Sequence, residues 1–192
     1  RVAGTFAGHG IGHGDVDDAG IGGAGLHFQK GSGLGLERNH LGARDAVLEL
    51  SRRKALAAAA QHPGCVVLAA DTLVSVDDQA LGKPRDGQDA HRMLRMLSGR
   101  WHQVYTGVTV VAADGRIFSA ADGTDVHFED MSDDDIRRYI ATGEPMDKAG
   151  AYGIQDAGGL FVSRIDGDFY NVIGLPLSMV NRLLKSAFSC NL

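Results

Sequence analysis

A single acidic residue follows an uninterrupted apolar stretch near the middle of the chain. Residues 65–70 (CVVLAA) have the length and composition of a buried β-strand, and Asp71 and Thr72 come directly after it. A carboxylate there is costly unless it is solvated, paired or bound to a metal ion. Strand ends at a sheet edge are also where sites gather in α/β proteins. The pattern favours Asp71 as a site residue, with a capping or turn-forming aspartate as the alternative.

A second segment carries positive charge in a stiff loop. Residues 81–86 (LGKPRD) place Lys83 and Arg85 between a glycine and an expected helix, with a proline between them. Helix N-termini and lysine side chains are both good partners for phosphate groups. This loop is predicted to bind phosphate, and an ordinary surface loop is the alternative.

A third segment combines small residues with one amide side chain. Residues 147–155 (DKAGAYGIQ) contain glycines and alanines that let the backbone approach a ligand, followed by Gln155. The amide of Gln155 offers both a donor and an acceptor, so it can read the edge of a base. The alternative is a tight connecting loop.

Helices and strands of ordinary length are expected to position these residues. Apolar spacing and end signals predict helices over residues 43–61, 86–97, 132–142 and 177–187. Apolar or alternating runs predict strands over residues 65–70 (continuing to 76), 104–112, 117–128, 159–165 and 169–173. Because helices are mixed with hairpins, we expect an α/β fold with a mixed sheet and flanking helices.

Composition excludes several classes of protein. The net charge of -5 and the isoelectric point of about 5.9 make extended contact with nucleic acid an unfavourable hypothesis. Cys65 and Cys190 form neither a disulfide framework nor a zinc pattern, which fits a reducing compartment. No apolar run approaches the roughly 18 residues that span a membrane, and no signal peptide is apparent. We expect a cytoplasmic protein without nucleic-acid or membrane partners.

The first forty residues differ from the rest. About a dozen of the chain's 27 glycines lie there, which raises the cost of ordering the backbone, so mostly loop or poor order is expected. Residues 20–25 match G-x-G-x-x-G, but no strand precedes them, and a chance match is the preferred interpretation. His9, His13 and Asp15 would share a face only in a helix, which the glycines between them oppose.

One further motif, Ser51-Arg52-Arg53, has a composition suited to phosphate. It falls in the middle of the expected helix 43–61, where the two arginines point in different directions. A solvated helix face is therefore the preferred interpretation.

An ordered set of segments resembles one protein family. These segments read AADT, LGKPRD, LSG, VYTG, TGEPMDKAGAYGIQ and NVIGLPL, and they span residues 69–177. In this order they closely resemble the Maf family of nucleotide pyrophosphatases, with the likeness covering about residues 43–186. The resemblance implies a Maf-like domain over residues 43–192, preceded by an atypical segment, residues 1–42. It also implies an elongated fold with a central cleft, related to inosine triphosphatases.

The resemblance further implies an activity. Maf proteins cleave a nucleoside triphosphate between its α and β phosphates with a divalent metal ion, Mg²⁺ or Mn²⁺. They are linked to arrest of cell division, and many are homodimers. Asp71 matches the proton acceptor and would also hold the metal. Lys54 and Lys83 match lysines of the substrate site, and Thr72 and Gln155 match positions that bear on substrate choice. The sequence of residues 147–155 resembles that of the family branch that hydrolyses dTTP and UTP.

The resemblance fails at the N-terminus. Family members begin with a strand and a Ser-x-Ser-Pro-Arg-Arg loop that binds phosphate, and residues 1–40 contain no such sequence. Two alternatives therefore stand beside a dTTP/UTP pyrophosphatase. One is a catalytically impaired protein that binds nucleotides or regulates division. The other is a pyrophosphatase for another nucleotide, such as 7-methyl-GTP.

Overall fold

The computed structural model describes residues 2–7, 26–30 and 42–188. Its strands are β1 (Val2–Ala7), β2 (Leu26–Lys30), β3 (Val66–Val76), β4 (Gln79–Leu81), β5 (Trp101–Val111), β6 (Ile117–Phe128) and β7 (Val162–Asp166). Its helices are α1 (Ala43–Gln61), α2 (Gly87–Leu97), α3 (Asp133–Ala141), α4 (Phe169–Ile173) and α5 (Leu177–Phe188). Short 3-10 helices are η1 (Glu144–Asp147), η2 (Ala149–Ala151) and η3 (Ala157–Phe161).

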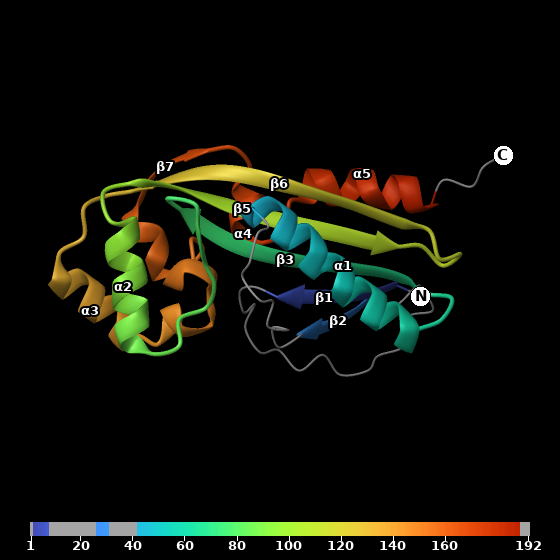
Figure 1. Cartoon of the computed structure of the whole chain (residues 1–192), viewed down its shortest axis with the longest axis horizontal. Helices are drawn as coiled ribbons and strands as arrows, with labels where there is room; N and C mark the ends of the chain where they lie inside the picture. Colours follow the sequence, from blue (N-terminus) through green and yellow to red (C-terminus); the bar gives the residue numbers. More distant parts are fainter. Residues whose placement is uncertain (1, 8–25, 31–41, 189–192) are drawn as a thin grey trace.

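A single mixed sheet organises the molecule. Its strand order is β2-β1-β3-β5-β6-β7, and β4 pairs with β3. β1 runs parallel to β2 and β3, whereas β3, β5, β6 and β7 form an antiparallel series. The long strands give the molecule its elongated shape (Figure 1). The expected α/β fold with a mixed sheet and flanking helices is confirmed.

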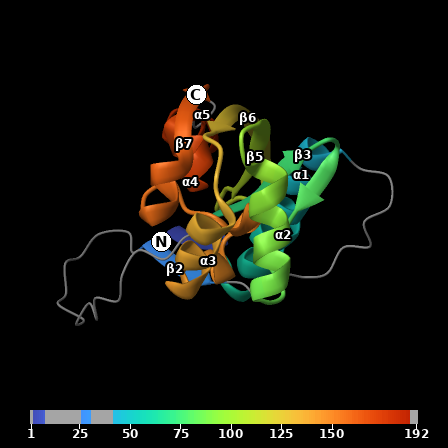
Figure 2. The same ribbon diagram turned by 90° about the vertical axis from the view of Figure 1, so that its left-hand side faces the viewer.

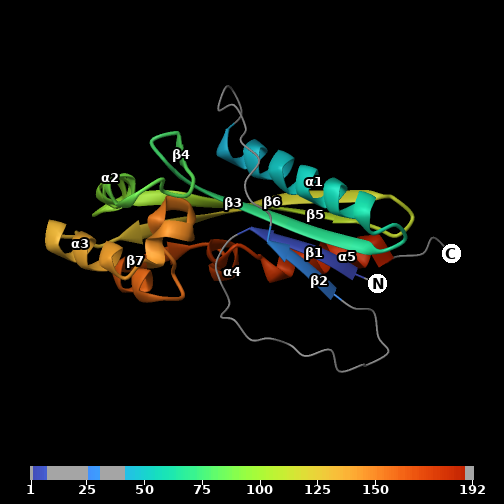
Figure 3. The ribbon, with the colours of Figure 1, turned by 90° about the horizontal axis from the view of Figure 1, so that it is seen from below.

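The two faces of β3 are covered by different elements. Side chains alternate along a strand, so odd-numbered residues such as Val67 and Ala69 pack against Ala55 and Ala58 of α1. Even-numbered residues at the start of β3 pack against α5 instead, and those at its end pack against α2 and α3. Figure 3 shows α1 and α5 on opposite sides of the sheet, and Figure 2 shows α2 and α3 together at one end.

Local signals explain where the helices begin. Asp86 caps α2 by accepting a hydrogen bond from the backbone N–H of Asp89. Ser132 and Asp135 form the expected capping box of α3.

Gly107 of β5 lets α1 pack closely on the sheet, since a Cβ at this position would lie 2.3 Å from the carbonyl oxygen of Val47.

Two strand predictions near the C-terminus need correction. Residues 169–173 form helix α4 rather than a strand, because Asp168 caps the helix at Tyr170 and Gly174 ends it at a φ of 103°. So short an apolar run has no period that separates helix from strand. Residues 157–161 form η3, so the strand predicted over residues 159–165 begins only at Val162.

The N-terminal segment also differs from expectation. Loop was predicted for most of residues 1–40, and this is wrong for 2–7 and 26–30, which are β1 and β2. Backbone pairing of β1 with β3, and of β2 with β1, supplies the order that local composition does not favour. The G-x-G-x-x-G match and the group of His9, His13 and Asp15 lie outside the described residues. In the described part of the chain, no helix is both long and apolar enough to cross a bilayer.

Candidate active site

A change of partners along one edge of β3 marks the candidate site. β1 pairs with β3 from Val66 as far as Asp71, and β4 pairs with it only from Val74 onward. Thr72 and Leu73 therefore lie between the two partners, within the paired segments that the structure describes. Because side chains alternate along a strand, Asp71 and Thr72 beside this gap face opposite sides of the sheet.

Asp71 lies inside a strand rather than after one. The apolar run before it and the extended stretch after it form one strand, β3, which continues through Asp71 to Val76. The strand that ends beside Asp71 is β1, whose last residue, Ala7, is its register partner. The position at a sheet edge arises from the neighbouring strand, which sequence reasoning did not anticipate.

A buried ion pair occupies the α1 face of this gap. Lys54 of α1 donates from Nζ to Oδ1 of Asp71, and the two residues are 9% and 8% exposed. Burial raises the pKa of the Asp71 carboxyl above its ordinary value, while Lys54 and, more weakly, Lys83 oppose that rise. A carboxylate with a raised pKa is a better proton acceptor near neutral pH.

Lys83 belongs to the same charged region. It is exposed on the loop after β4, and its charge lowers the pKa of Asp71. A backbone hydrogen bond of 3.0 Å from Gly150 N to the Gly82 carbonyl joins this loop to η2. The predicted phosphate loop and the predicted base-reading segment are thereby held side by side.

Thr72 faces the other side of the sheet. Its Oγ1 lies 2.9 Å from Oγ1 of Thr106 on β5, and both residues are buried. Thr72 also lines a narrow hollow, and the full set of residues around it is Thr72, Val74, Val104, Ala149, Tyr152 and Val172. The segment that leads to Gln155 therefore approaches Thr72 as well as the Lys83 loop.

Gln155 is exposed on a loop that Glu144 holds in place. The Glu144 carboxylate accepts hydrogen bonds from the Tyr139 hydroxyl (2.6 Å) and from the backbone N–H groups of Ala157 (3.1 Å) and Gly158 (3.2 Å). The Tyr139 hydroxyl in turn accepts from Gly153 N at 3.2 Å. This carboxylate thus braces the backbone on both sides of Gln155, and sequence reasoning missed it.

Residues that sequence reasoning missed also surround Thr72. Thr106 and Asn171 lie in the segments VYTG and NVIGLPL, to which no chemistry was assigned. A Cβ at Gly174 would lie 3.1 Å from the Thr72 hydroxyl oxygen. No periodic pattern could have found these contacts, because they join elements far apart in the chain.

The Ser51-Arg52-Arg53 motif has no part in this region. Ser51 is buried and bonded to Thr109, while Arg53 is exposed and paired with Glu49 on the same helix. The motif lies within a helix, as predicted, and its two arginines are exposed, but the prediction of a solvated face is wrong for Ser51, which packs against β5.

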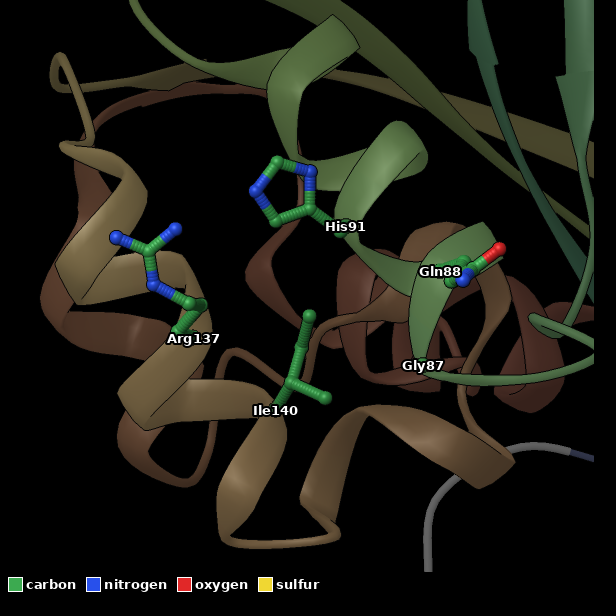
Figure 4. Close-up of a pocket in the computed structure, with 5 residues that line it drawn as sticks. All are labelled: Gly87, Gln88, His91, Arg137 and Ile140. Atoms are coloured by element: carbon green, nitrogen blue, oxygen red, sulfur yellow. The ribbon is translucent and has the colours of Figure 1, made fainter.

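A larger hollow lies elsewhere. It has a volume of about 320 Å³ and opens between α2 and α3, where His91 and Arg137 flank Ile140 (Figure 4). None of the predicted site residues lines it. His91 lies 3.5 Å from Asp133, and Arg137 is paired with Asp134, so both side chains already have acidic neighbours.

The geometry around Asp71 bears on the predicted divalent metal ion. Among the described residues, no three His, Cys, Asp or Glu side chains gather as a ready-made site. Mg²⁺ usually takes only one or two carboxylates and completes its shell with waters and substrate phosphates. Asp71 as a single carboxylate fits that second kind of site.

Fold and site together define an α/β protein with a buried lysine–aspartate pair at a sheet edge and exposed positive charge beside it. The Maf-like protein family matches residues 32–187 of the chain. The chain therefore belongs to the Maf family.

Individual relatives agree with the family match. A dTTP/UTP pyrophosphatase of Bdellovibrio bacteriovorus is 46% identical over 78% of this chain and 81% of its own length. Proteins of the same name from Bacillus velezensis and Thermococcus onnurineus are each 51% identical, over 78% and 76% of this chain and 78% of their own lengths. A solved nucleoside-triphosphatase (dITP/XTP pyrophosphatase) of Mycobacterium abscessus matches at 13% identity over 54% of this chain and 60% of that one. The TM-score of this structural match is 0.32.

Proposed function

We propose that this protein hydrolyses dTTP and UTP to the monophosphate and pyrophosphate. Membership of the Maf family supports this proposal, as do several relatives that bear the name dTTP/UTP pyrophosphatase. The observation that carries it is the buried Lys54–Asp71 pair at the gap between β1 and β4, with Lys83 close enough to act on the same carboxylate.

The chemistry assigns one role to each group. Asp71 accepts a proton from a water molecule, and the oxygen of that water attacks the α-phosphorus. The bond between the α-phosphorus and the oxygen that bridges it to the β-phosphate breaks. Pyrophosphate then leaves with the electron pair of that bond. Lys54 and Lys83 offset the negative charge on the phosphates and the leaving group. Thr72 and Gln155 bear on which base is accepted.

A divalent cation, Mg²⁺ or Mn²⁺, belongs to the proposal. Asp71 would hold it together with phosphate oxygens of the substrate, and it would neutralise charge and polarise the phosphate. Isothermal calorimetry with Mn²⁺ and a non-hydrolysable α,β-methylene-UTP tests this. Equal binding of the analogue with and without the ion would contradict the proposal.

Release of pyrophosphate tests the activity. The full chain is incubated with dTTP, UTP, CTP, dATP, GTP and 7-methyl-GTP in the presence of Mg²⁺ or Mn²⁺. Preferential turnover of dTTP and UTP supports the proposal. Preferential turnover of 7-methyl-GTP would instead place the protein in another substrate branch.

A second candidate is a protein that binds nucleotides without turning them over, linked to regulation of cell division. The observation in its favour is that residues 1–40 contain no Ser-Pro-Arg-Arg sequence. Thermal stabilisation by dTTP without release of pyrophosphate would support this candidate. Turnover that disappears in Asp71→Asn would exclude it.

The expected assembly is a proposal as well. We propose a homodimer located in the cytoplasm, because many Maf proteins are dimers and the cysteine usage fits a reducing compartment. Sedimentation equilibrium across a concentration series measures the assembly, and a monomer at all concentrations would contradict it.

A further inference from the structure

A chain of hydrogen bonds with a fixed direction leads to Thr72. It begins at Asn171 of α4, whose Nδ2 donates to the Val104 carbonyl (2.8 Å) and to Thr124 Oγ1 (3.0 Å). A carbonyl oxygen only accepts, so the contact with Val104 fixes which end of the Asn171 amide is the nitrogen. Thr124 passes its own proton to the Asp168 carbonyl at 3.1 Å. The position of α4 is therefore tied to β5 and β6.

Thr106 occupies the next position in this chain. Its Oγ1 donates to the backbone carbonyl of Asn171 at 2.9 Å. A hydroxyl group has one proton, so Thr106 has none left for Thr72, 2.9 Å away on the neighbouring strand. Thr106 must accept in that second contact, and Thr72 must donate.

The consequence is a defined polarity for Thr72. Its single proton points into the protein toward Thr106, so toward a ligand it offers lone pairs only. Thr106 and Asn171 are fully buried, which leaves no room for solvent to exchange these roles. Reversing the chain would take the Thr106 donor from the Asn171 carbonyl, which would keep only the Gly174 backbone N–H at 3.0 Å and so lose one buried hydrogen bond.

The surroundings of Thr72 make this polarity relevant to a ligand. Thr72 lines a hollow whose other lining residues are mostly apolar. The polar exception, the Tyr152 hydroxyl, is bonded to His102 Nε2 at 2.8 Å. The absence of a side chain at Gly174 also leaves the Thr72 hydroxyl oxygen uncovered, because a Cβ at position 174 would lie 3.1 Å from that oxygen. The hollow is too narrow to enclose a base, so a base would contact Thr72 at the opening of the hollow.

We infer that Thr106 is a positioning residue that fixes Thr72 as a hydrogen-bond acceptor for the imide N–H shared by uracil and thymine. This inference rests on the proposed function and names the part of the base that the site reads. Cytosine carries an acceptor at the same ring position, so its lone pair would face the lone pairs of Thr72. A site whose polar group is matched to one partner rejects the mismatched analogue.

Gln155 cannot supply this discrimination by itself. Its amide is exposed, and rotation by 180° exchanges its donor and acceptor ends. Gln155 can therefore adapt to uracil or cytosine, whereas Thr72 is held in one state by Thr106.

The test compares Thr106→Val with Thr106→Ser in the full chain. Valine matches threonine in shape but removes the acceptor for the Thr72 proton, so that proton can turn toward the base. Thr109→Val is the matched control. Thr109 is a buried threonine of the same strand that is hydrogen-bonded to Ser51 and Ser119, on the face that α1 covers.

The measured quantity is the ratio of kcat/KM for UTP to that for CTP. We expect Thr106→Val to lower this ratio about tenfold, from the loss of one neutral hydrogen bond with UTP and the relief of a repulsion with CTP. Activity toward CTP should rise in absolute terms, which a purely structural defect would not produce. Thr106→Ser and Thr109→Val should keep the wild-type ratio.

The outcomes separate this inference from the proposed function. An unchanged ratio in Thr106→Val, or equal losses for both nucleotides, overturns the role of Thr106 while the pyrophosphatase stands. Absence of turnover in the wild-type protein overturns the proposed function instead. In that case, the ratio of dissociation constants for the α,β-methylene analogues of UTP and CTP, measured by calorimetry, tests Thr106 in the same variants.

Discussion

The two faces of β3 at its gap carry different kinds of chemistry. Asp71 faces α1 and is paired with a buried lysine, whereas its neighbour Thr72 faces α4 within a chain of neutral hydrogen bonds. Alternation along the strand separates them although they are adjacent in sequence. The comparison suggests that one face performs the reaction and the other selects the substrate. Each prediction below changes a titratable group, either on one of these faces or on the loop that carries Gln155.

The largest effect is expected from Asp71→Asn on the charged face. The amide keeps the shape of the side chain but cannot accept the proton of water, so kcat for dTTP should fall by about 10³-fold or more. Release of pyrophosphate measures it. Asp125→Asn, at an exposed position on β6, is the matched control and should retain activity. Substantial activity in Asp71→Asn would remove the chemical role from this face.

Lys54→Met should have the next largest effect. Loss of the cation should lower kcat/KM by about 10²-fold through weaker charge neutralisation. It also removes an influence that lowers the pKa of Asp71, so that pKa rises further and the acidic limb of the pH profile should move to higher pH.

Two variants control for the loss of Lys54. Lys54→Arg retains the charge and should preserve the position of the acidic limb. Arg53→Met removes the neighbouring exposed cation of α1 and should leave the profile unchanged. A limb that stays in place in Lys54→Met would mean that a group other than Asp71 controls it.

On the face of the sheet that carries Thr72, protonation of a buried histidine should destabilise the fold. His102, on the same side of β5 as Thr106, is fully buried against Phe128 and Tyr152, and burial lowers its pKa from 6.5 to about 4. In the unfolded chain, the His102 imidazole binds a proton below about pH 6.5. In the folded protein, it does so only below about pH 4. Stability should therefore fall by about 3 kcal/mol as the pH decreases through that window.

Urea denaturation of the wild type and His102→Gln between pH 7 and 4 measures this effect. Asp71 works in the opposite sense, because its raised pKa favours the folded state as the pH falls. The difference between the two proteins isolates His102. His91→Gln, on α2, should follow the wild type. Parallel curves for the wild type and His102→Gln would refute the assignment.

The smallest effect is expected from Glu144→Gln at the loop that carries Gln155. The neutral amide is a weaker acceptor for the Tyr139 hydroxyl and the two backbone N–H groups, so stability should fall by about 1 kcal/mol. KM for UTP should rise by about threefold while kcat changes little. Glu49→Gln, which weakens an exposed pair on α1, is the control. An unchanged KM would separate the Gln155 loop from substrate binding.

The sequence predicted most elements and several site residues. The antiparallel strands have clear apolar patterns, helix 43–61 is followed by the helix-breaking pair Pro63 and Gly64, and the capping box at Ser132 is a local feature. Asp71 was found because a carboxylate after an apolar run is unusual. Helix α4 was missed because five residues are too few to show a period. Strands β1 and β2 were missed because their order depends on the pairing of β1 with β3 and of β2 with β1.

What the sequence determined by itself was the set of chemical groups: a carboxylate in an apolar strand, lysines on a helix and a loop, and a family signature in order along the chain. Only the tertiary structure decided how those groups meet. The end of β1, the approach of α1 at Gly107 and the position of α4 place Lys54 on one side of the sheet and Thr106 and Asn171 on the other. Proton direction and pKa depend on such contacts between distant segments, and local sequence patterns do not record them.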